Sequence, residues 1–178
     1  MPDVQAFVDR VGLIAQALTD LDVQPVLVGG MALVMLGSRR VTGDFDFVIE
    51  KPGDRLKSVV DVLYGPGLEL TSRLNADGDV TATIDNPRVA TIRLQLDKPD
   101  SAFFYDKETG LRVDLLFDFP IAAATLAERA THLKVRSRAL AIASEADLLE
   151  MKQRARAERD FAGDAQDIEF LEARRKRR

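Results

Sequence analysis

The spacing of apolar residues along the first third of the chain alternates between helical and extended periods. Apolar residues recur at steps of three and four over residues 4–21, which predicts an amphipathic helix. The short apolar run 26–28 predicts a buried strand, and residues 31–36 are compatible with a helix directly after it. A polar connector then leads into a second strand at 45–50, and a turn opens a helix over residues 54–63.

The remainder of the chain is predicted to begin with loops and strands and to end in helices. The segment 71–86 is polar and rich in turn residues, which predicts a flexible loop near a site. Apolar and polar residues alternate over 89–96, which predicts a half-buried strand. A hairpin tip at 106–110 precedes a strand at 111–119. Helices are predicted at 121–129, 145–159 and 165–174. The pattern indicates an α/β (α+β) fold, with a small mixed β-sheet backed by helices and a helical C-terminal region.

Composition is consistent with one domain. The 178 residues fit a single domain over 1–178, with a core at about 1–120 and a helical region at about 121–174. The chain has no cysteine, which excludes disulfide scaffolds, thiolate metal sites and cysteine nucleophiles and favours a cytoplasmic location. No apolar run is long enough to cross a membrane. The net charge of −4 argues against a general nucleic-acid coat.

The clearest candidate chemistry lies between the first two strands. Gly29 and Gly30 stand at the turn from strand to helix, where glycines let the backbone approach a phosphate closely. Asp44 and Asp46 are separated by one residue on the second strand, so their side chains point to the same face. Two carboxylates on one face beside a phosphate cradle suit a pair of hard divalent cations. We therefore expect both cations to bind Asp44 and Asp46.

A third acid, Asp114, stands in an otherwise apolar strand, where a buried carboxylate is costly without a cation or hydrogen bonds. If this strand lies beside that of Asp44 and Asp46, three carboxylates converge. Asp114 would then complete one metal shell and orient or deprotonate an acceptor hydroxyl. Each feature alone also has a structural interpretation, as a simple turn or a solvated strand edge. Their combination, with apolar residues around the acids, favours a functional site.

Two segments resemble a known superfamily. Val28-Gly29-Gly30, followed after thirteen residues by Asp44-Phe45-Asp46-Phe47, resembles the signature of the DNA polymerase β-like nucleotidyltransferases. Residues 37–46 are similar to the Gly-x-x-Arg-x-Thr-x-Asp-x-Asp form of the AbiEii-like branch, which includes abortive-infection and toxin–antitoxin nucleotidyltransferases. The strand 111–116 and the helical segments within 144–168 are similar to later parts of the same branch.

The resemblance implies magnesium binding by the three aspartates and a triphosphate cradle formed by the two glycines. It also implies contacts between phosphates and cationic side chains, namely Arg39 or Arg40 and, from the C-terminal helix, Lys152. The spacing from Lys152 to Asp164 and Asp167 is longer than the common form. Residues 152, 156 and 159 are basic and share one helix face, which fits either a solvated surface or a groove for triphosphate or RNA.

These observations predict a nucleotidyltransferase that uses two Mg²⁺ ions and moves a nucleoside monophosphate from a nucleoside triphosphate to an acceptor hydroxyl. The resemblance favours an RNA end or a protein side chain as acceptor, in a toxin–antitoxin or phage-defence system with a cognate toxin or antitoxin partner. One alternative is a non-catalytic nucleotide- or partner-binding module such as an antitoxin. Another is a small-molecule nucleotidyltransferase of the aminoglycoside type. The heptad spacing of the first helix also leaves a homodimer open.

Overall fold

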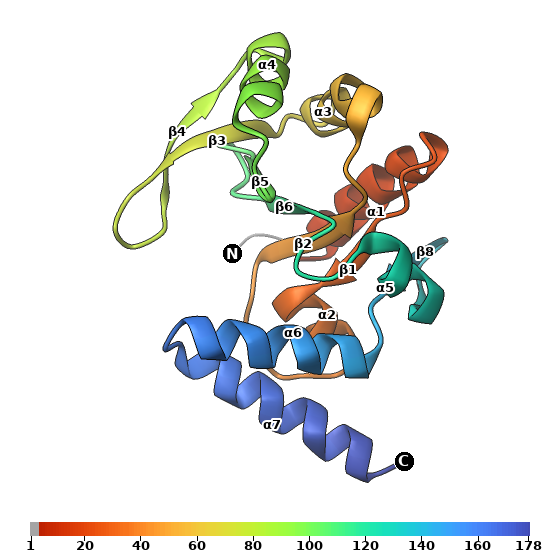
Figure 1. The fold of residues 1–178 in the computed structure, drawn as a ribbon. Coiled ribbons are helices and arrows are strands. Elements are labelled where there is room, and N and C mark those ends of the chain that lie inside the picture. Colours follow the sequence, from red (N-terminus) through yellow and green to blue (C-terminus); the bar gives the residue numbers. More distant parts are fainter. Residues whose placement is uncertain (1–3) are drawn as a thin grey trace.

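The computed structural model describes residues 4–178, which form one mixed sheet with helices on both faces (Figure 1). The strand order is β4-β3-β5-β6-β2-β1-β8-β7. The strands are β1 (Val26–Val28), β2 (Asp44–Ile49), β3 (Glu69–Leu74), β4 (Val80–Ile84), β5 (Ser101–Tyr105), β6 (Arg112–Phe117), β7 (Thr131–Val135) and β8 (Arg138–Ile142). The helices are α1 (Val4–Asp20), α2 (Gly29–Met35), α3 (Leu56–Tyr64), α4 (Pro87–Asp97), α5 (Ala123–Arg129), α6 (Glu145–Glu158) and α7 (Ala162–Lys176), with a 3₁₀ turn, η1 (Gly53–Arg55), before α3. The predicted fold class is confirmed.

The hydrophobic core lies between the sheet and the layer of α1, α3 and α4. Helix α3 contacts both α1 and α4. Helix α1 also contacts β8, and α4 contacts β3 and β4. The odd-numbered side chains of β2, Phe45 and Phe47, are buried in this core, as is Phe104 of β5. Alternation along the strands therefore sends the even-numbered acids of β2 to the opposite face.

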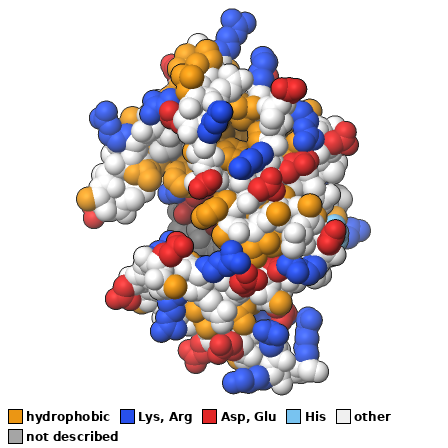
Figure 2. Space-filling view, viewed as in Figure 1, with side chains coloured by type: hydrophobic (Ala, Val, Ile, Leu, Met, Phe, Trp, Pro, Cys, Tyr) orange, Lys and Arg blue, Asp and Glu red, His pale blue; other side chains and the backbone are white. Residues whose placement is uncertain are grey.

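That opposite face is covered over only half of the sheet. Helix α2 contacts β1 and β2, α5 contacts β1, and α6 and α7 pack together (Figure 1). On β5 the residues that share this face are only partly buried, whereas Ala102 and Phe104 on the core side are buried. The space-filling view shows the molecule indented between the β3–β4 hairpin and helices α6 and α7 (Figure 2). Among residues 4–178, the side chains of this face on β5 are thus only partly covered.

Three segments differ from the prediction, and α4 is the first. The alternation over 89–96 indicated a strand, but residues 87–97 form a helix. The side-chain oxygen of Asn86 accepts hydrogen bonds from the backbone N–H groups of Arg88 and Val89, and Pro87 occupies the first helical turn. This helix start signal outweighs the alternation of apolar and polar residues. In the helix, Leu96 and other apolar residues of the segment are exposed to solvent.

Hairpins account for the other differences. The expected loop at 71–86 consists largely of β3 and β4, joined by a turn in which the Asn75 side chain accepts from the N–H groups of Asp77 and Asp79. Residues 131–142, inside the expected helical region, form the β7–β8 hairpin. Its turn contains Arg136 at a φ of 56° in place of a glycine, so the sequence lacks the usual hairpin signature.

The apolar face of α1 is already used within the molecule. Phe7, Val11, Ile14 and Leu18 are buried in the core. This face is therefore not available for the zipper between two copies that the heptad spacing left open. No helix of residues 4–178 is long and apolar enough to cross a membrane.

Candidate active site

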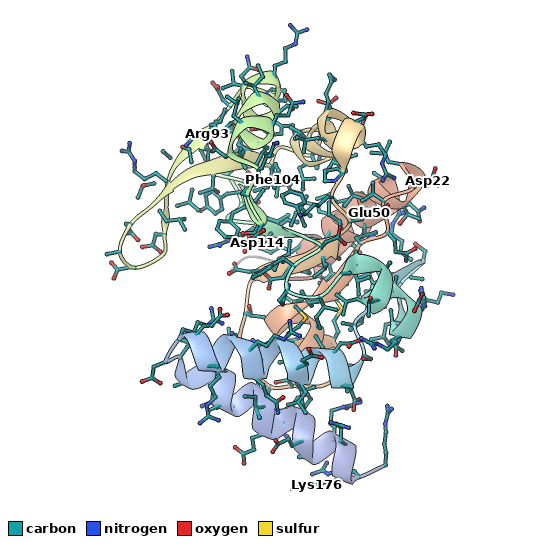
Figure 3. The ribbon with its side chains drawn as sticks, in the orientation of Figure 1. Asp22, Glu50, Arg93, Phe104, Asp114 and Lys176 are labelled. Carbon is teal, nitrogen blue, oxygen red and sulfur yellow. The ribbon has the colours of Figure 1, made fainter. Side chains whose placement is uncertain are left out.

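The three acids come from two adjacent parallel strands. β2 pairs with β6 in a register that sets Asp46 beside Asp114 and Asp44 beside Arg112. The predicted adjacency of these strands is thus confirmed. Asp114 is buried and Asp46 is partly buried, whereas Asp44 at the start of β2 is exposed. Figure 3 shows Asp114 on the side of the sheet opposite to Phe104.

Burial, together with neighbouring negative charge, raises the pKa of the two inner carboxyls. Burial, and then the negative charges of Asp114 and Asp44, raise the pKa of Asp46 to about 7. The positive charge of Lys152 acts on Asp46 in the opposite direction. Burial also raises the pKa of Asp114, although the hydrogen bonds and charge of Arg112 oppose the shift. The site therefore has a deficit of positive charge that the protein only partly offsets.

Arg112 was not recognised as a site residue from the sequence. Its Nε donates to Oδ1 of Asp114 at 2.9 Å and its Nη2 to Oδ2 at 3.0 Å. The same guanidinium lies over the ring of Phe103, 4.7 Å from its centroid. The available signal was the spacing: two residues before Asp114 on a strand means the same face. Phe103, the registered partner of Asp114 on β5, could not be placed without the pairing of the strands.

Gly29 lies directly against the metal-ligand candidate Asp46. Its φ of 69° is in the left-handed region, which favours glycine. A Cβ at this position would lie 2.9 Å from Cγ of Asp46 and closer still to its Oδ2. A Cβ at Gly30 would lie 3.1 Å from Cζ of Arg40. Gly29 therefore lies against an acid and Gly30 against a cation.

The predicted cations have different surroundings. Arg40 binds the buried carboxylate of Asp167, and Arg39 is exposed without an ion pair in the described part of the chain. Lys152 is buried, and its Nζ lies 2.8 Å from Oδ2 of Asp167 and 3.4 Å from Oδ1 of Asp164. The basic face of α6 is therefore neither fully solvated nor an open groove.

A second cation completes this network. Arg159 donates from Nε to Oδ2 of Asp164 at 2.9 Å. Burial alone would raise the pKa of Asp164, but the hydrogen bonds and charges of Arg159 and Lys152 outweigh it and lower the pKa. Asp164 and Asp167 thus tie α6 and α7 together, and Asp167 also holds the connector before β2 through Arg40.

The donor set fits a divalent cation in its chemistry. Carboxylate oxygens are the protein ligands that Mg²⁺ prefers, and a cation would offset both the burial and the like-charge repulsion that raise the pKa of Asp46. In this structure, however, no three acidic or histidine side chains of residues 4–178 are close enough together to hold a metal ion. Arg112 occupies both oxygens of Asp114 instead.

The overall fold is similar to that of several solved structures. An antigenic nucleotidyltransferase-like protein from Paracoccidioides brasiliensis aligns with a TM-score of 0.59 and 16% identity, over 96% of this chain and 77% of that protein. A lincosamide antibiotic adenylyltransferase with bound lincomycin aligns with a TM-score of 0.57 and 13% identity, over 92% and 95%. A candidate nucleotidyltransferase from Thermotoga maritima aligns with a TM-score of 0.51 and 13% identity, over 97% and 94%.

The chain has the nucleotidyltransferase fold. Its sequence matches no protein-family model and no curated protein. The likeness is one of three-dimensional structure, at identities of 13–16% that are too low to transfer residues one by one. The AbiEii-like branch that the motif suggested is not confirmed by these relatives.

Proposed function

We propose that the protein is an enzyme that transfers a nucleoside monophosphate from a nucleoside triphosphate to an acceptor hydroxyl and releases pyrophosphate. One observation carries the proposal: Asp46 and Asp114 are registered partners on parallel strands, and Gly29 lies against Asp46. In this arrangement, phosphates that approach the backbone at Gly29 would lie beside the carboxylates of Asp46 and Asp114. The fold is similar to that of nucleotidyltransferases.

Each group has a stated part in the proposed reaction. Gly29 and Gly30 let the triphosphate approach the backbone, and Arg40 and Lys152 provide positive charge beside it. Asp114 accepts the proton of the acceptor hydroxyl. The hydroxyl oxygen forms a bond to the α-phosphorus while the bond from that phosphorus to the pyrophosphate oxygen breaks. Pyrophosphate leaves with the electron pair of the broken bond.

Magnesium fits the acids as the cofactor of this reaction. Asp44 and Asp46, together with Asp114, would hold the two ions, which supply positive charge against the phosphate oxygens. Arg112 donates one hydrogen bond to each oxygen of Asp114, which leaves a lone pair on each oxygen for a cation. Arg39 lies in the connector between α2 and β2 and is exposed, so it is a further candidate for contact with phosphate.

The acceptor class is open between macromolecules and small molecules. The resemblance to the AbiEii-like branch suggests an RNA end or a protein side chain, in a toxin–antitoxin or phage-defence setting with a cognate partner. Among the structural relatives, the adenylyltransferase solved with lincomycin favours a small molecule instead. A non-catalytic nucleotide-binding module remains the second candidate, because the acids are not gathered around a metal position.

The test is transfer of label from each of four α-labelled nucleoside triphosphates with magnesium, using total RNA, cell extract and a small-molecule mixture as acceptors. Wild type and Asp114→Ala are compared side by side. Label transferred only by wild type supports the enzyme, and its sensitivity to nuclease or protease identifies the acceptor class. Magnesium-dependent binding of nucleotide with no transfer to any acceptor contradicts the enzyme and supports the binding module.

A further inference from the structure

The ends of two helices leave a cavity over the end of β6. The turn η1 begins at Gly53, directly after Pro52, and leads into α3. Helix α4 ends at Asp97, where Lys98 follows with a left-handed φ of 44° and Pro99 comes next. Because proline fixes φ, both turns are stiff, which restricts how far they can close the space between the helix ends. The space-filling view shows a hydrophobic recess in the region where α3 and α4 come together, with basic side chains beside it (Figure 2).

The wall of this cavity is mainly apolar. Its volume is about 320 Å³, at the lower end of the ~300–1,000 Å³ that small-molecule sites occupy. Leu56 of α3, Leu94 of α4 and Phe117 of β6 line it, and each keeps 6–9% of its surface exposed although it belongs to the hydrophobic core. Pro52 and Pro99 add apolar surface from the two turns. An apolar group that covers this wall removes it from water, which favours binding.

The charges of the cavity have one sign. Lys51 and Lys98 line it, and no acidic residue of the described chain does. Neither ammonium group has an ion-pair partner within residues 4–178. The neighbouring acid Asp97 is bound by Arg93, whose Nε lies 2.6 Å from its Oδ2. Asp118 accepts from the backbone N–H of Lys51 at 2.9 Å, and not from its side chain. An anionic group would give both ammonium groups a charged partner.

The size of the cavity and its polar edge narrow the class of ligand. A volume of 320 Å³ accommodates roughly ten non-hydrogen atoms, if each takes about the 30 Å³ that a water molecule occupies in the liquid. Gln95 also lines the cavity and is exposed, so its amide is able to donate to an anion there. The lining therefore suits a small molecule with one anionic end and an apolar body.

We propose that this cavity between α3, α4 and β6 binds a small organic acid. The apolar body covers Leu56, Leu94 and Phe117, and the carboxylate lies between the two lysines. Phe117 stands three positions beyond Asp114 on β6 and is buried on the core side of the sheet, so the ligand does not occupy the proposed reaction centre. The inference is therefore independent of the proposed nucleotidyl transfer.

Protein-observed NMR tests the site without nucleotide. The ¹⁵N-labelled chain is titrated with octanoate and with phenylacetate, and then with octanamide and phenylacetamide, their neutral counterparts. We expect the acids to bind with a Kd of about 0.1–1 mM, as is usual for ligands of this size. The perturbed amides should be those of the cavity, including Gly53, Leu56 and Gln95. The neutral amides should bind about three- to thirtyfold more weakly, because they lose two exposed charge pairs.

Substitutions at the edge of the cavity test the role of charge. Lys51→Gln and Lys98→Gln should each weaken the acids about two- to fivefold and leave the neutral amides unchanged. Lys134→Gln is the matched control, since Lys134 is an exposed lysine of β7 at the far edge of the sheet. It should leave binding unchanged. Gln95→Glu adds a negative charge at an exposed helix position and should weaken the acids to a similar degree without loss of folding.

A series of chain lengths tests the apolar wall. From butanoate to octanoate, each added methylene should strengthen binding about two- to fourfold, because the cavity removes it from water. Octanoate at about ten times its Kd should also raise the melting temperature by about 3–6 °C. Acetate, which carries the charge without the apolar body, should do neither at the same concentration.

Several results would overturn the inference. They are the absence of perturbation by either acid at millimolar concentration, perturbed amides that map away from the cavity, and equal affinity for an acid and its amide. An affinity that does not change with chain length contradicts the apolar wall. An equal effect of Lys134→Gln and Lys98→Gln would show that net charge, rather than the cavity, sets the affinity.

Discussion

Substitution of Gly29 by alanine tests the contact between the cradle and Asp46. Two effects add at this position. The left-handed φ of 69° costs an alanine about 1–2 kcal/mol. The new methyl group would also lie 2.9 Å from Cγ of Asp46, so the carboxylate has to move at a further cost of about 1–3 kcal/mol. We therefore expect Gly29→Ala to lose about 2–5 kcal/mol of unfolding free energy.

Gly53→Ala is the matched control for the backbone term. Gly53 has a φ of 54°, and a Cβ there would have no atom within 4 Å. This variant should lose only about 1–2 kcal/mol. Denaturant unfolding gives the free energy of unfolding of both variants. The difference between their losses, about 1–3 kcal/mol, is the cost of the contact with Asp46. In a thermal melt the same difference is about 2–12 °C for a domain of this size.

Nucleotide binding gives the second measurement on the same pair. Displacement of Asp46 should weaken magnesium-dependent binding of nucleoside triphosphate, measured by calorimetry, about ten- to hundredfold. Gly53→Ala should bind as wild type does. If Gly29→Ala has the same free energy of unfolding as Gly53→Ala and binds nucleotide as wild type does, Gly29 does not position Asp46 and the argument for the cradle is wrong.

Three further outcomes follow from the site and the fold. Asp114→Asn should abolish transfer of labelled nucleotide and leave the melting temperature equal to or above that of wild type, because burial raises the pKa of Asp114 despite the hydrogen bonds from Arg112, so that folding no longer buries a charged group; a large loss of stability would show that the acid is structural. Asp164→Asn should lose roughly 2–4 kcal/mol at neutral pH, because Arg159 and Lys152 lose a charged partner. The pKa of Asp164 is lowered on folding, so this stability is present above the ordinary carboxyl pKa of about 4 and is lost as pH falls below it. The melting temperatures of wild type and Asp164→Asn should therefore converge from neutral to acidic pH. A difference in melting temperature that persists at acidic pH contradicts the ion pair. Asn86→Ala should lose about 1 kcal/mol and speed amide hydrogen exchange in α4 alone; protection unchanged there would refute the cap.

The strands that carry the candidate acids were predictable because their signals are local. Gly29 and Gly30 follow an apolar run, and the Asp-x-Asp pair keeps period two within another, so both the elements and the shared face follow from the sequence. The adjacency of Asp46 and Asp114 could be predicted only on the condition that their two strands are neighbours, because the sequence does not show which strands pair. The resemblance supported that condition, and the register confirms it.

The open half of the sheet could not be predicted for a physical reason. Strands such as β3 and β4 have one face exposed and end in a polar turn, so their composition resembles a loop. Helix α4 was misassigned because Val89, Ile92 and Leu96 remain exposed, which blurs the helical period that Ala90 and Leu94 define. Phe103 becomes a site residue only through the register that pairs β6 with β5, whereas Arg112 shares the face of Asp114 by its spacing on β6.

The ion pair between Arg40 and Asp167 joins residues 127 positions apart in the chain. A ribosome that adds about 5–20 residues per second needs roughly 6–25 s to synthesise that interval. Throughout this time the nascent chain already contains both glycines and the Asp44–Asp46 pair, but the connector between them has no partner for Arg40. The cradle is therefore fixed late, when α7 docks, and a nascent chain that lacks this helix should not retain nucleotide.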